Sequence, residues 1–506
     1  MRTLGLIVLL ALLAGLPNLP RSMHGDQVFA LLGAESLARG ELLYRDFWDI
    51  RQPGLFVIYW LAGKLFGFDE IGLHLFDLLF WLAFAIFVSF TWPHIGRGRS
   101  ASEANSSEAS LALRPRPMWS IWPAVTTSGW YWAVTGGVQQ MQPEAMVGPI
   151  LYVHLWLVLR WSRLSWAIAG LVAAIVLLLK LMYLPLLGIA VLFAIIRLRR
   201  EQSWRATVTH TSIYVFCGTL ALASSLIPWL IAGELDILRR TYFDTPTQML
   251  AELPRPSIDR LVDAAKWFGT RYGPLLALAA IGSLRLWHDG KREWMLFLFA
   301  WCLTSLIVIV AQRFSWWSYH FMLLALPVGL LAAEGCSACI TRGKTLGKVL
   351  LLAVFMPMIA AVVLKWVPII RESFCLTPTD RAAMLLHEEV YRKAKEETSF
   401  LRDGTSRPGS IFVAGEPIFY RYAGRTQATA IHGWSLELYP AEIRLLLVKQ
   451  LIHAEPAYIF IDRVYYKKLI EEWYPELVEL LRTQYRILRV SDTGTWYELL
   501  FLPLAS

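Results

Sequence analysis

Two carboxylates, Asp26 and Glu144, each lie at the edge of a long apolar stretch. Asp26 follows the first apolar run within a few residues, and Glu144 follows Pro143 at the end of a short loop with no other charge. Each has a plain structural explanation, because Asp is favoured as a helix N-cap and Glu144 complements the positive end of a helix that Pro143 begins. The alternative is chemical: two acids on one side of a membrane can share a metal cation or a proton-transfer task.

A second group of candidates is basic and lies among aromatic side chains. The stretch 43–54 combines aromatic residues, a proline and charges of both signs, including Arg45 and Arg51. That composition suits the depth of lipid headgroups, either as an interfacial loop with Trp and Arg anchors or as part of a site. A later short loop contains Arg313 and His320 among aromatic residues. The planar Arg fork suits phosphate, and the plain alternative is an aromatic belt with one anchor.

Lys180 interrupts a long apolar stretch, and Pro185 follows five residues later. The stretch 166–196 is too long for one membrane-spanning helix, so Lys180 and Pro185 mark the turn of a helical hairpin. A positive charge inside an apolar segment costs a few kcal/mol and needs a partner or an exit. Lys180 therefore either snorkels to the interface or contacts a lipid phosphate.

The composition indicates the kind of chain that positions these groups. Hydrophobic residues make up 56% of the 506 residues and charged residues 17%, with a mean hydropathy of +0.47. A soluble domain carries about 25% charge, so both a soluble globule and a disordered chain are excluded. The net charge of +9 comes from Lys and Arg in short loops between apolar runs, which is typical of membrane anchoring and not of nucleic-acid binding.

Apolar runs long enough to cross a bilayer predict an all-α polytopic membrane bundle with about eleven transmembrane helices. The runs lie near 3–20, 72–92, 118–134, 144–161, 166–180, 182–197, 211–232, 273–287, 294–311, 320–340 and 348–369. With this count, the strongly basic short loops all fall on one side, which is the cytoplasm. The N-terminus is then inside, while the segments 21–71 and 233–272 and the C-terminal tail are outside.

The tail has a different composition and predicts a small α/β extracytoplasmic domain over 371–506, after a transmembrane domain over 1–370. Charged residues return there, and short apolar strands alternate with amphipathic helices. We expect buried strands at Ile411–Gly415 and Tyr458–Asp462, a helix from Tyr465 to about Gln484, and strands near Arg486–Val490 and Trp496–Leu502. The run 27–39 near the N-terminus is also predicted to be helical.

Taken in order, these features resemble bacterial membrane glycosyltransferases of the GT-C fold, in the group related to protein O-mannosyltransferases and lipid A aminoarabinose transferases. The matching features are Asp26 after the first helix, the amphipathic stretch around Tyr44–Asp46 with Gln52–Gly54 after it, and the Pro143–Glu144 pair. A Lys late in a hydrophobic run and the pair Tyr319–His320 before Leu326-Pro327 complete the pattern. One departure is Gln27, which stands where the mannosyltransferases have the second acid of an Asp-Glu pair.

The resemblance implies transfer of a sugar from a polyprenyl-phosphate-linked donor to a hydroxyl acceptor, on a glycan, a lipid or a protein, with inversion at the sugar. The enzyme works beside membrane lipids, at the outer face of the cytoplasmic membrane. Asp26 is the expected base for the acceptor hydroxyl. Cations stabilise the departing phosphate, and Glu144 holds substrate or, with Asp26, a divalent metal ion. The candidate cations are Arg45, Arg51, Lys180, Arg313 and His320.

Two other classes of function remain open from the sequence. A transporter or flippase of lipid-linked saccharides is favoured by charges at the bilayer midplane and by matching inverted halves, and the sequence shows neither. A non-catalytic membrane scaffold with the tail as a binding module is the third reading. Loss of the acid at Asp26 without effect would favour the scaffold.

Overall fold

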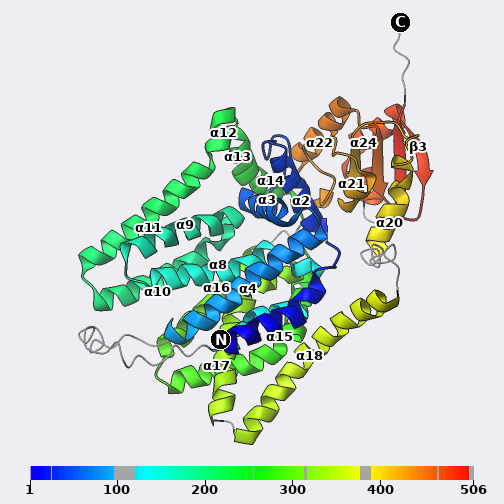
Figure 1. Cartoon of the computed structure of the whole chain (residues 1–506). Helices are drawn as coiled ribbons and strands as arrows, with labels where there is room; N and C mark the ends of the chain where they lie inside the picture. Colours follow the sequence, from blue (N-terminus) through cyan, green and yellow to red (C-terminus); the bar gives the residue numbers. More distant parts are fainter. Residues whose placement is uncertain are drawn as a thin grey trace. The chain divides into compact units, whose positions relative to one another are not determined.

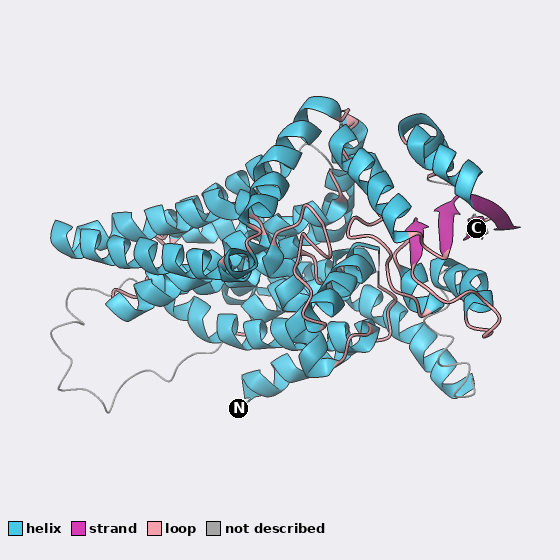
Figure 2. Cartoon of the chain, turned by 90° about the horizontal axis from the view of Figure 1, so that it is seen from above, coloured by secondary structure: helices cyan, strands magenta, loops and turns pink. Residues whose placement is uncertain are grey.

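The computed structural model describes residues 2–23, 25–95, 120–254, 256–312, 316–342, 344–375, 389–463 and 466–500. Helices dominate these residues, with one small sheet near the C-terminus (Figures 1 and 2). The chain divides into two compact units. We call Met1–Arg21, Glu70–Ser224 and Pro256–Cys375 the helical unit, and Ser22–Asp69, Ser225–Arg255 and Leu376–Ser506 the mixed unit.

The helical unit contains the apolar helices. Its elements are α1 (Arg2–Leu10), continued by η1 (Ala11–Gly15) and η2 (Leu16–Asn18), then α4 (Glu70–Ile95), α6 (Trp122–Ala124), η3 (Val125–Gly129), α7 (Trp130–Val134), η4 (Gly137–Gln139), α8 (Pro143–Val158), α9 (Arg163–Leu179), η5 (Leu181–Tyr183), α10 (Leu184–Glu201), α11 (Trp204–Ser225), α15 (Ile258–His288), α16 (Arg292–Ala311), η7 (Ser318–Leu324), α17 (Ala325–Arg342) and α18 (Lys344–Cys375). A helix overlaps each of the eleven predicted apolar runs.

Among the described residues, six helical segments are long and apolar enough to cross a membrane. They are Glu70–Pro93, Leu181–Glu201, Trp204–Ala232, Arg292–Ala311, Ser318–Thr341 and Thr345–Val367. Four further apolar helices are shorter: Thr3–Asn18, Pro53–Phe66, Pro143–Val158 and Arg163–Leu179. These helices support a multi-pass membrane protein, while the number of eleven crossings stays a prediction.

Helix α15 is twice as long as the apolar run that predicted it. It begins at Ile258, where the Ser257 hydroxyl caps the backbone N–H of Asp259, and it continues to His288. Its first half is amphipathic, so a search for purely apolar runs detects only the second half. The segment 233–272, expected as an outer loop, therefore contains half of a long helix and three shorter helical elements.

Two glycines let α15 and α17 pack backbone against backbone. A Cβ atom added at Gly282 would come within 1.9 Å of the Leu331 carbonyl oxygen, and one at Gly335 within 2.0 Å of the Leu278 carbonyl oxygen. Small residues permit this close approach in membrane helices. The contact fixes the axis of α17, which follows directly on η7 and its His320.

The mixed unit combines short helices with a four-stranded sheet. Its helices are α2 (Gly25–Ala38), α3 (Pro53–Phe66), α12 (Ile227–Ala232), α13 (Leu235–Arg239), η6 (Arg240–Asp244), α14 (Thr245–Glu252), α20 (Glu389–Thr398), η9 (Ser399–Leu401), α21 (Ile418–Ala423), η10 (Leu436–Leu438), α22 (Ala441–Ala454), α23 (Lys467–Trp473) and α24 (Pro475–Gln484). The strands are β1 (Ile411–Ala414), β2 (Tyr458–Asp462), β3 (Tyr485–Val490) and β4 (Gly494–Leu499), in the order β1-β2-β4-β3. The pair β1–β2 is parallel, and the other two pairs are antiparallel.

The predictions for the tail are confirmed in outline. All four strands form at or near the short apolar segments that predicted them. The single helix expected over 465–484 is instead two helices, because the chain leaves helical geometry at Tyr474, directly before Pro475. Helix α2 confirms the helix expected at 27–39.

One hydrophobic core joins the three chain segments of the mixed unit. Phe29 and Phe56 come from the first segment, Trp229 from the second, and Phe412 and Ile459 from the sheet in the third. Burial of such large side chains contributes about 1.5–3 kcal/mol each. The first segment is therefore held against the tail by the same core that stabilises the sheet.

Candidate functional site

The predicted site residues fall into both units of the chain. Asp26, Arg45 and Arg51 belong to the mixed unit, and Glu144, Lys180 and His320 belong to the helical unit. Arg313 lies outside the described residues. Each unit brings part of its own candidates together.

Asp26 accepts two hydrogen bonds on the same carboxylate oxygen. Helix α2 begins at Gly25, so Asp26 lies inside the first turn and not at the cap position. Arg51 Nη2 donates to Asp26 Oδ1 at 2.7 Å, and Trp434 Nε1 donates to the same atom at 2.9 Å. The Asp26 side chain is 13% exposed. Two donors from segments far apart in sequence thus fix the direction of this carboxylate.

Arg51 connects Asp26 to a second, more deeply buried acid. Its Nη1 donates to Asp49 Oδ2 at 2.5 Å, and the Asp49 side chain is only 2% exposed. The guanidinium also lies over the ring of Phe29, 5.4 Å from its centroid. The planar guanidinium directs N–H donors from two different nitrogens at the two carboxylates, a geometry that the single nitrogen of a Lys does not reproduce.

His432 extends the chain of charged groups by one more member. The backbone N–H of Trp434 donates to His432 Nδ1 at 3.0 Å, which places the proton of a neutral ring on Nε2, 3.4 Å from Asp49 Oδ2. Burial lowers the pKa of His432 although Asp49 opposes this. Burial alone would raise the pKa of Asp49, but the Arg51 charge and the His432 hydrogen bond hold it below its ordinary value.

We call Asp26, Arg51, Asp49, His432 and Trp434 the Asp26 cluster. The sequence pointed to Asp26 and Arg51 and missed the other three. Asp49 lies within the aromatic stretch that was singled out, so its neighbourhood carried a signal. His432 and Trp434 lie between α21 and η10, far from Asp26 in the sequence. No local sequence pattern marks them.

A glycine marks how closely the tail approaches the start of α2. A Cβ atom added at Gly25 would lie 2.6 Å from Trp434 Cζ2 and 2.7 Å from Glu416 Oε2. Glu416 follows closely on strand β1. Its carboxylate therefore lies beside the residue that precedes Asp26.

Arg45 is not part of the Asp26 cluster. It forms a bidentate pair with its neighbour Asp46, with distances of 2.9 and 2.8 Å, and it is half exposed. Its guanidinium lines a cavity of the mixed unit instead. Of the two arginines in the stretch 43–54, Arg51 thus belongs to the Asp26 cluster and Arg45 to the lining of the cavity.

Glu144 forms the second cluster, in the helical unit. Pro143 opens α8 as predicted, and Glu144 in its first turn is 1% exposed. Lys180 Nζ donates to Glu144 Oε1 at 2.7 Å and to Gln312 Oε1 at 2.7 Å. His320 Nε2 lies 3.8 Å from Glu144 Oε1. We call these four residues the Glu144 cluster.

The Glu144 cluster is built from helix ends. Lys180 terminates α9 with an extended backbone at the turn before α10, as the hairpin prediction required, and Gln312 terminates α16. Lys180 has no acidic neighbour in its own segment, and the fold supplies Glu144 from another segment as its partner. Its side chain is still 24% exposed.

Each of the two candidate carboxylates faces a cation of its own unit. Across the part of the chain that the structure describes, no three His, Cys, Asp or Glu side chains come together as metal ligands. Asp26 faces the cation of Arg51, and Glu144 faces the cation of Lys180. That Asp26 and Glu144 hold a divalent metal ion stays a prediction from the sequence, and no step proposed below runs through a metal.

The fold is similar to that of ArnT from Cupriavidus metallidurans. The crystal structure of that protein bound to undecaprenyl phosphate matches with a TM-score of 0.58 at 13% identity, over 97% of both chains. Its structure in the apo state matches with a TM-score of 0.57 at 12% identity, again over 97% of both chains. No protein-family model and no curated protein sequence matches the chain.

This likeness confirms the GT-C fold that the sequence resemblance implied. It extends over nearly the full length of both chains, so it includes the tail as well as the apolar helices.

Proposed function

We propose that the protein is a membrane glycosyltransferase, which moves a sugar from a polyprenyl-phosphate-linked donor to a hydroxyl acceptor at the outer face of the cytoplasmic membrane. The observation that carries this proposal is Asp26, an acid held in one direction by Arg51 and Trp434. The fold likeness supports the donor class, because the matched ArnT structure contains undecaprenyl phosphate.

Asp26 acts as the base in the proposed reaction. Its carboxylate takes the proton of the acceptor hydroxyl while that oxygen attacks the anomeric carbon of the donor sugar. The bond from this carbon to the phosphate oxygen breaks, and the phosphate leaves with the electron pair. A base that is fixed in direction keeps the attacking oxygen aligned, which is worth a large part of the rate.

The Glu144 cluster binds the phosphate of the donor in this proposal. The Lys180 ammonium has three N–H donors, and the described residues account for two of them through Glu144 and Gln312. With part of its side chain exposed, Lys180 can direct the third N–H at a phosphate oxygen. His320 adds a second donor next to it. The buried Glu144 holds the ammonium in place, so its charge is available without further rearrangement.

The proposal is tested by transfer from a synthetic undecaprenyl-phosphate sugar to acceptor extracts, with the purified protein in lipid vesicles. Asp26→Asn should lower turnover by about 10²–10⁴-fold while membrane insertion stays intact. Asp236→Asn, at a highly exposed acid on α13 of the same unit, is the matched control and should retain full turnover. An Asp26→Asn protein with most of its activity would remove Asp26 from the mechanism. Sugar movement across the vesicle membrane without any covalent product would instead establish the flippase alternative.

The same proposal places the N-terminus in the cytoplasm and the tail outside. A reporter that is active only outside the cytoplasm, fused after Ser506, should be active. If a second reporter, which works only in the cytoplasm, were active at the same position, the proposed topology and the outward-facing site would be wrong.

A further inference from the structure

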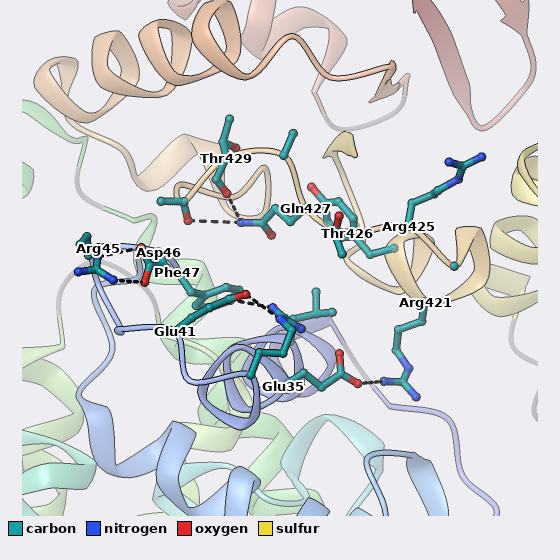
Figure 3. Close-up of a pocket in the computed structure, with 16 residues that line it drawn as sticks. Glu35, Glu41, Arg45, Asp46, Phe47, Arg421, Arg425, Thr426, Gln427 and Thr429 are labelled. Atoms are coloured by element: carbon teal, nitrogen blue, oxygen red, sulfur yellow. Dashed lines mark hydrogen bonds and ion pairs between the residues drawn. The ribbon is translucent and has the colours of Figure 1, made fainter. Parts of the chain in front are cut away.

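The mixed unit contains a cavity of about 950 Å³ that is separate from the Asp26 cluster (Figure 3). One wall is the C-terminal half of α2 with the loop that follows it, and the other is α21 with the segment that follows it. The size is within the range of ordinary small-molecule sites. The lining includes four arginines, three acids, Phe47 and Thr426.

Three ion pairs line the cavity, and each is partly exposed. Arg39 donates to both oxygens of Glu41 at 2.7 and 2.9 Å, and Arg45 pairs with Asp46 in the same bidentate way. Arg421 Nη1, on the α21 wall, donates to Glu35 Oε1, on the α2 wall, at 2.7 Å. Figure 3 shows the Arg45–Asp46 and Arg421–Glu35 pairs.

The fourth arginine of the lining is directed at the protein itself. Arg425 donates to the Leu401 carbonyl oxygen at 3.2 Å and to Ser406 Oγ at 3.0 Å. In Figure 3 its side chain extends away from the other labelled residues. The charges that face the cavity are therefore three guanidinium groups, each balanced by its own carboxylate.

This balance of positive and negative charges favours a ligand without net charge. A phosphate or carboxylate ligand would meet the three acids, and a cationic ligand would meet the three guanidinium groups. A vicinal pair of sugar hydroxyls both donates and accepts, and a guanidinium–carboxylate pair presents the matching acceptor and donors side by side. Because the ion pairs are already formed, their groups need little reordering on binding.

The rest of the lining also suits a sugar ring. Phe47 and Ala430 supply apolar surface for the C–H face, and the amide of Gln427 is held by donation to the Thr429 and Ala430 carbonyl oxygens at 2.7 and 3.3 Å. Glu41 is fixed further by the Ser36 hydroxyl, which donates to it at 2.6 Å. Both walls are therefore braced by bonds within the protein.

We propose that this cavity binds a neutral, hydroxyl-rich glycan, as the part of the acceptor that lies away from the hydroxyl that reacts at Asp26. Only the role as acceptor rests on the proposed function, because binding of the glycan itself needs no transfer. The inference narrows the acceptor from a glycan, a lipid or a protein to a saccharide, or to the saccharide part of a larger molecule.

Binding is measured with the full-length protein in lipid nanodiscs. The probes are labelled neutral tri- to hexasaccharides of mannose, glucose, galactose and N-acetylglucosamine, with phosphorylated and uronic-acid versions of equal length. The test variants are Glu35→Gln with Arg421→Gln, which removes one ion pair and keeps both side chains polar, and Thr426→Trp, which fills the cavity. The control is Glu479→Gln with Arg482→Gln, which removes an exposed ion pair on α24 outside the cavity.

We expect at least one neutral glycan to bind to the wild type, and both test variants to weaken it by at least about tenfold. The control should bind as the wild type does, and all three variants should bind an undecaprenyl-phosphate sugar normally. Binding of acidic glycans alone would overturn the ligand class, and unchanged binding in both test variants would overturn the location. A protein that binds the neutral glycan here but never transfers sugar to it would keep the cavity assignment and sink the proposed enzyme.

Discussion

The Asp26 cluster and the Glu144 cluster both set an acid against a cation, but they are built in opposite ways. In the Glu144 cluster one ammonium meets one carboxylate at a junction of helix ends, and the acid is almost fully enclosed. In the Asp26 cluster the charges alternate along a chain, so Arg51 serves two carboxylates and Asp49 meets both Arg51 and His432. The Glu144 cluster has a single Lys–carboxylate contact, whereas the Asp26 cluster distributes its charge over several contacts.

The largest effect is expected from breaking the single pair. Glu144→Gln leaves the Lys180 ammonium without its carboxylate in a low-dielectric site, which should cost about 3–5 kcal/mol of unfolding free energy. The double variant Glu144→Leu with Lys180→Met removes both charges and should recover most of that loss. Chemical denaturation in detergent micelles measures both. A double variant that is less stable than Glu144→Gln would show that the charges are not paired as described.

Arg51 tests whether the chain of charges needs its bridge. Arg51→Gln leaves Asp26 and Asp49 without their shared cation, and misdirection of Asp26 should lower turnover by about 10²-fold. Arg51→Lys should remain nearly as defective, because one ammonium cannot replace two forked contacts. Arg444→Gln, at a cation that lies over Trp473 on the surface of the same unit, is the control for loss of charge. Equal turnover in Arg51→Lys and the wild type would show that position 51 supplies charge alone.

Trp434 contributes one hydrogen bond to the same acid, so its loss should have a smaller effect. Trp434→Phe keeps an aromatic side chain and removes the Nε1–H donor. Turnover should fall about tenfold, with little change in the KM for the donor. Trp473→Phe is the matched control. If Trp434→Phe raised KM alone, Trp434 would be a binding residue and not a positioning residue for Asp26.

Acid should loosen the Asp26 cluster slightly through His432. Its folded-state pKa is lowered from 6.5, so the stability it contributes is present above about pH 6.5 and is lost as the pH falls below that value. The lowered pKa of Asp49 acts in a window below its ordinary 3.8, which is too acidic to interfere. Melting temperatures at pH 7.5 and 5.5 should differ more in the wild type than in His432→Asn, by an amount equivalent to about 1 kcal/mol or less. An identical pH dependence in both proteins would remove His432 as the group that titrates.

The contrast between the clusters also explains what the sequence could predict. The ends of helices have local sequence signals, so Pro143–Glu144 and the turn at Lys180 were placed correctly. The strands of the tail were predicted from their short apolar segments. The partners were not predictable in the same way. That Lys180 meets Glu144, 36 residues earlier, is a property of packing and not of either segment.

The mixed unit was the harder half to predict. His432 and Trp434 have no periodic or compositional signal, because they lie in an irregular segment between α21 and η10. In the helical unit, the amphipathic start of α15 was missed because its charged face interrupts the apolar run. The number of membrane crossings and the role of Arg313 remain predictions from the sequence.

The three-segment construction of the mixed unit has a consequence for the order of biosynthesis. Asp26 and Trp434 are separated by 408 residues, and their hydrogen bond requires both to have left the ribosome. At roughly 5–20 residues per second, the nascent chain carries an incomplete Asp26 cluster for on the order of 20–80 s. Helix α2 must wait through the synthesis of nearly the whole protein before its partner arrives. A chain that terminates early, however well its helices insert, contains every group of the Glu144 cluster and never an aligned Asp26.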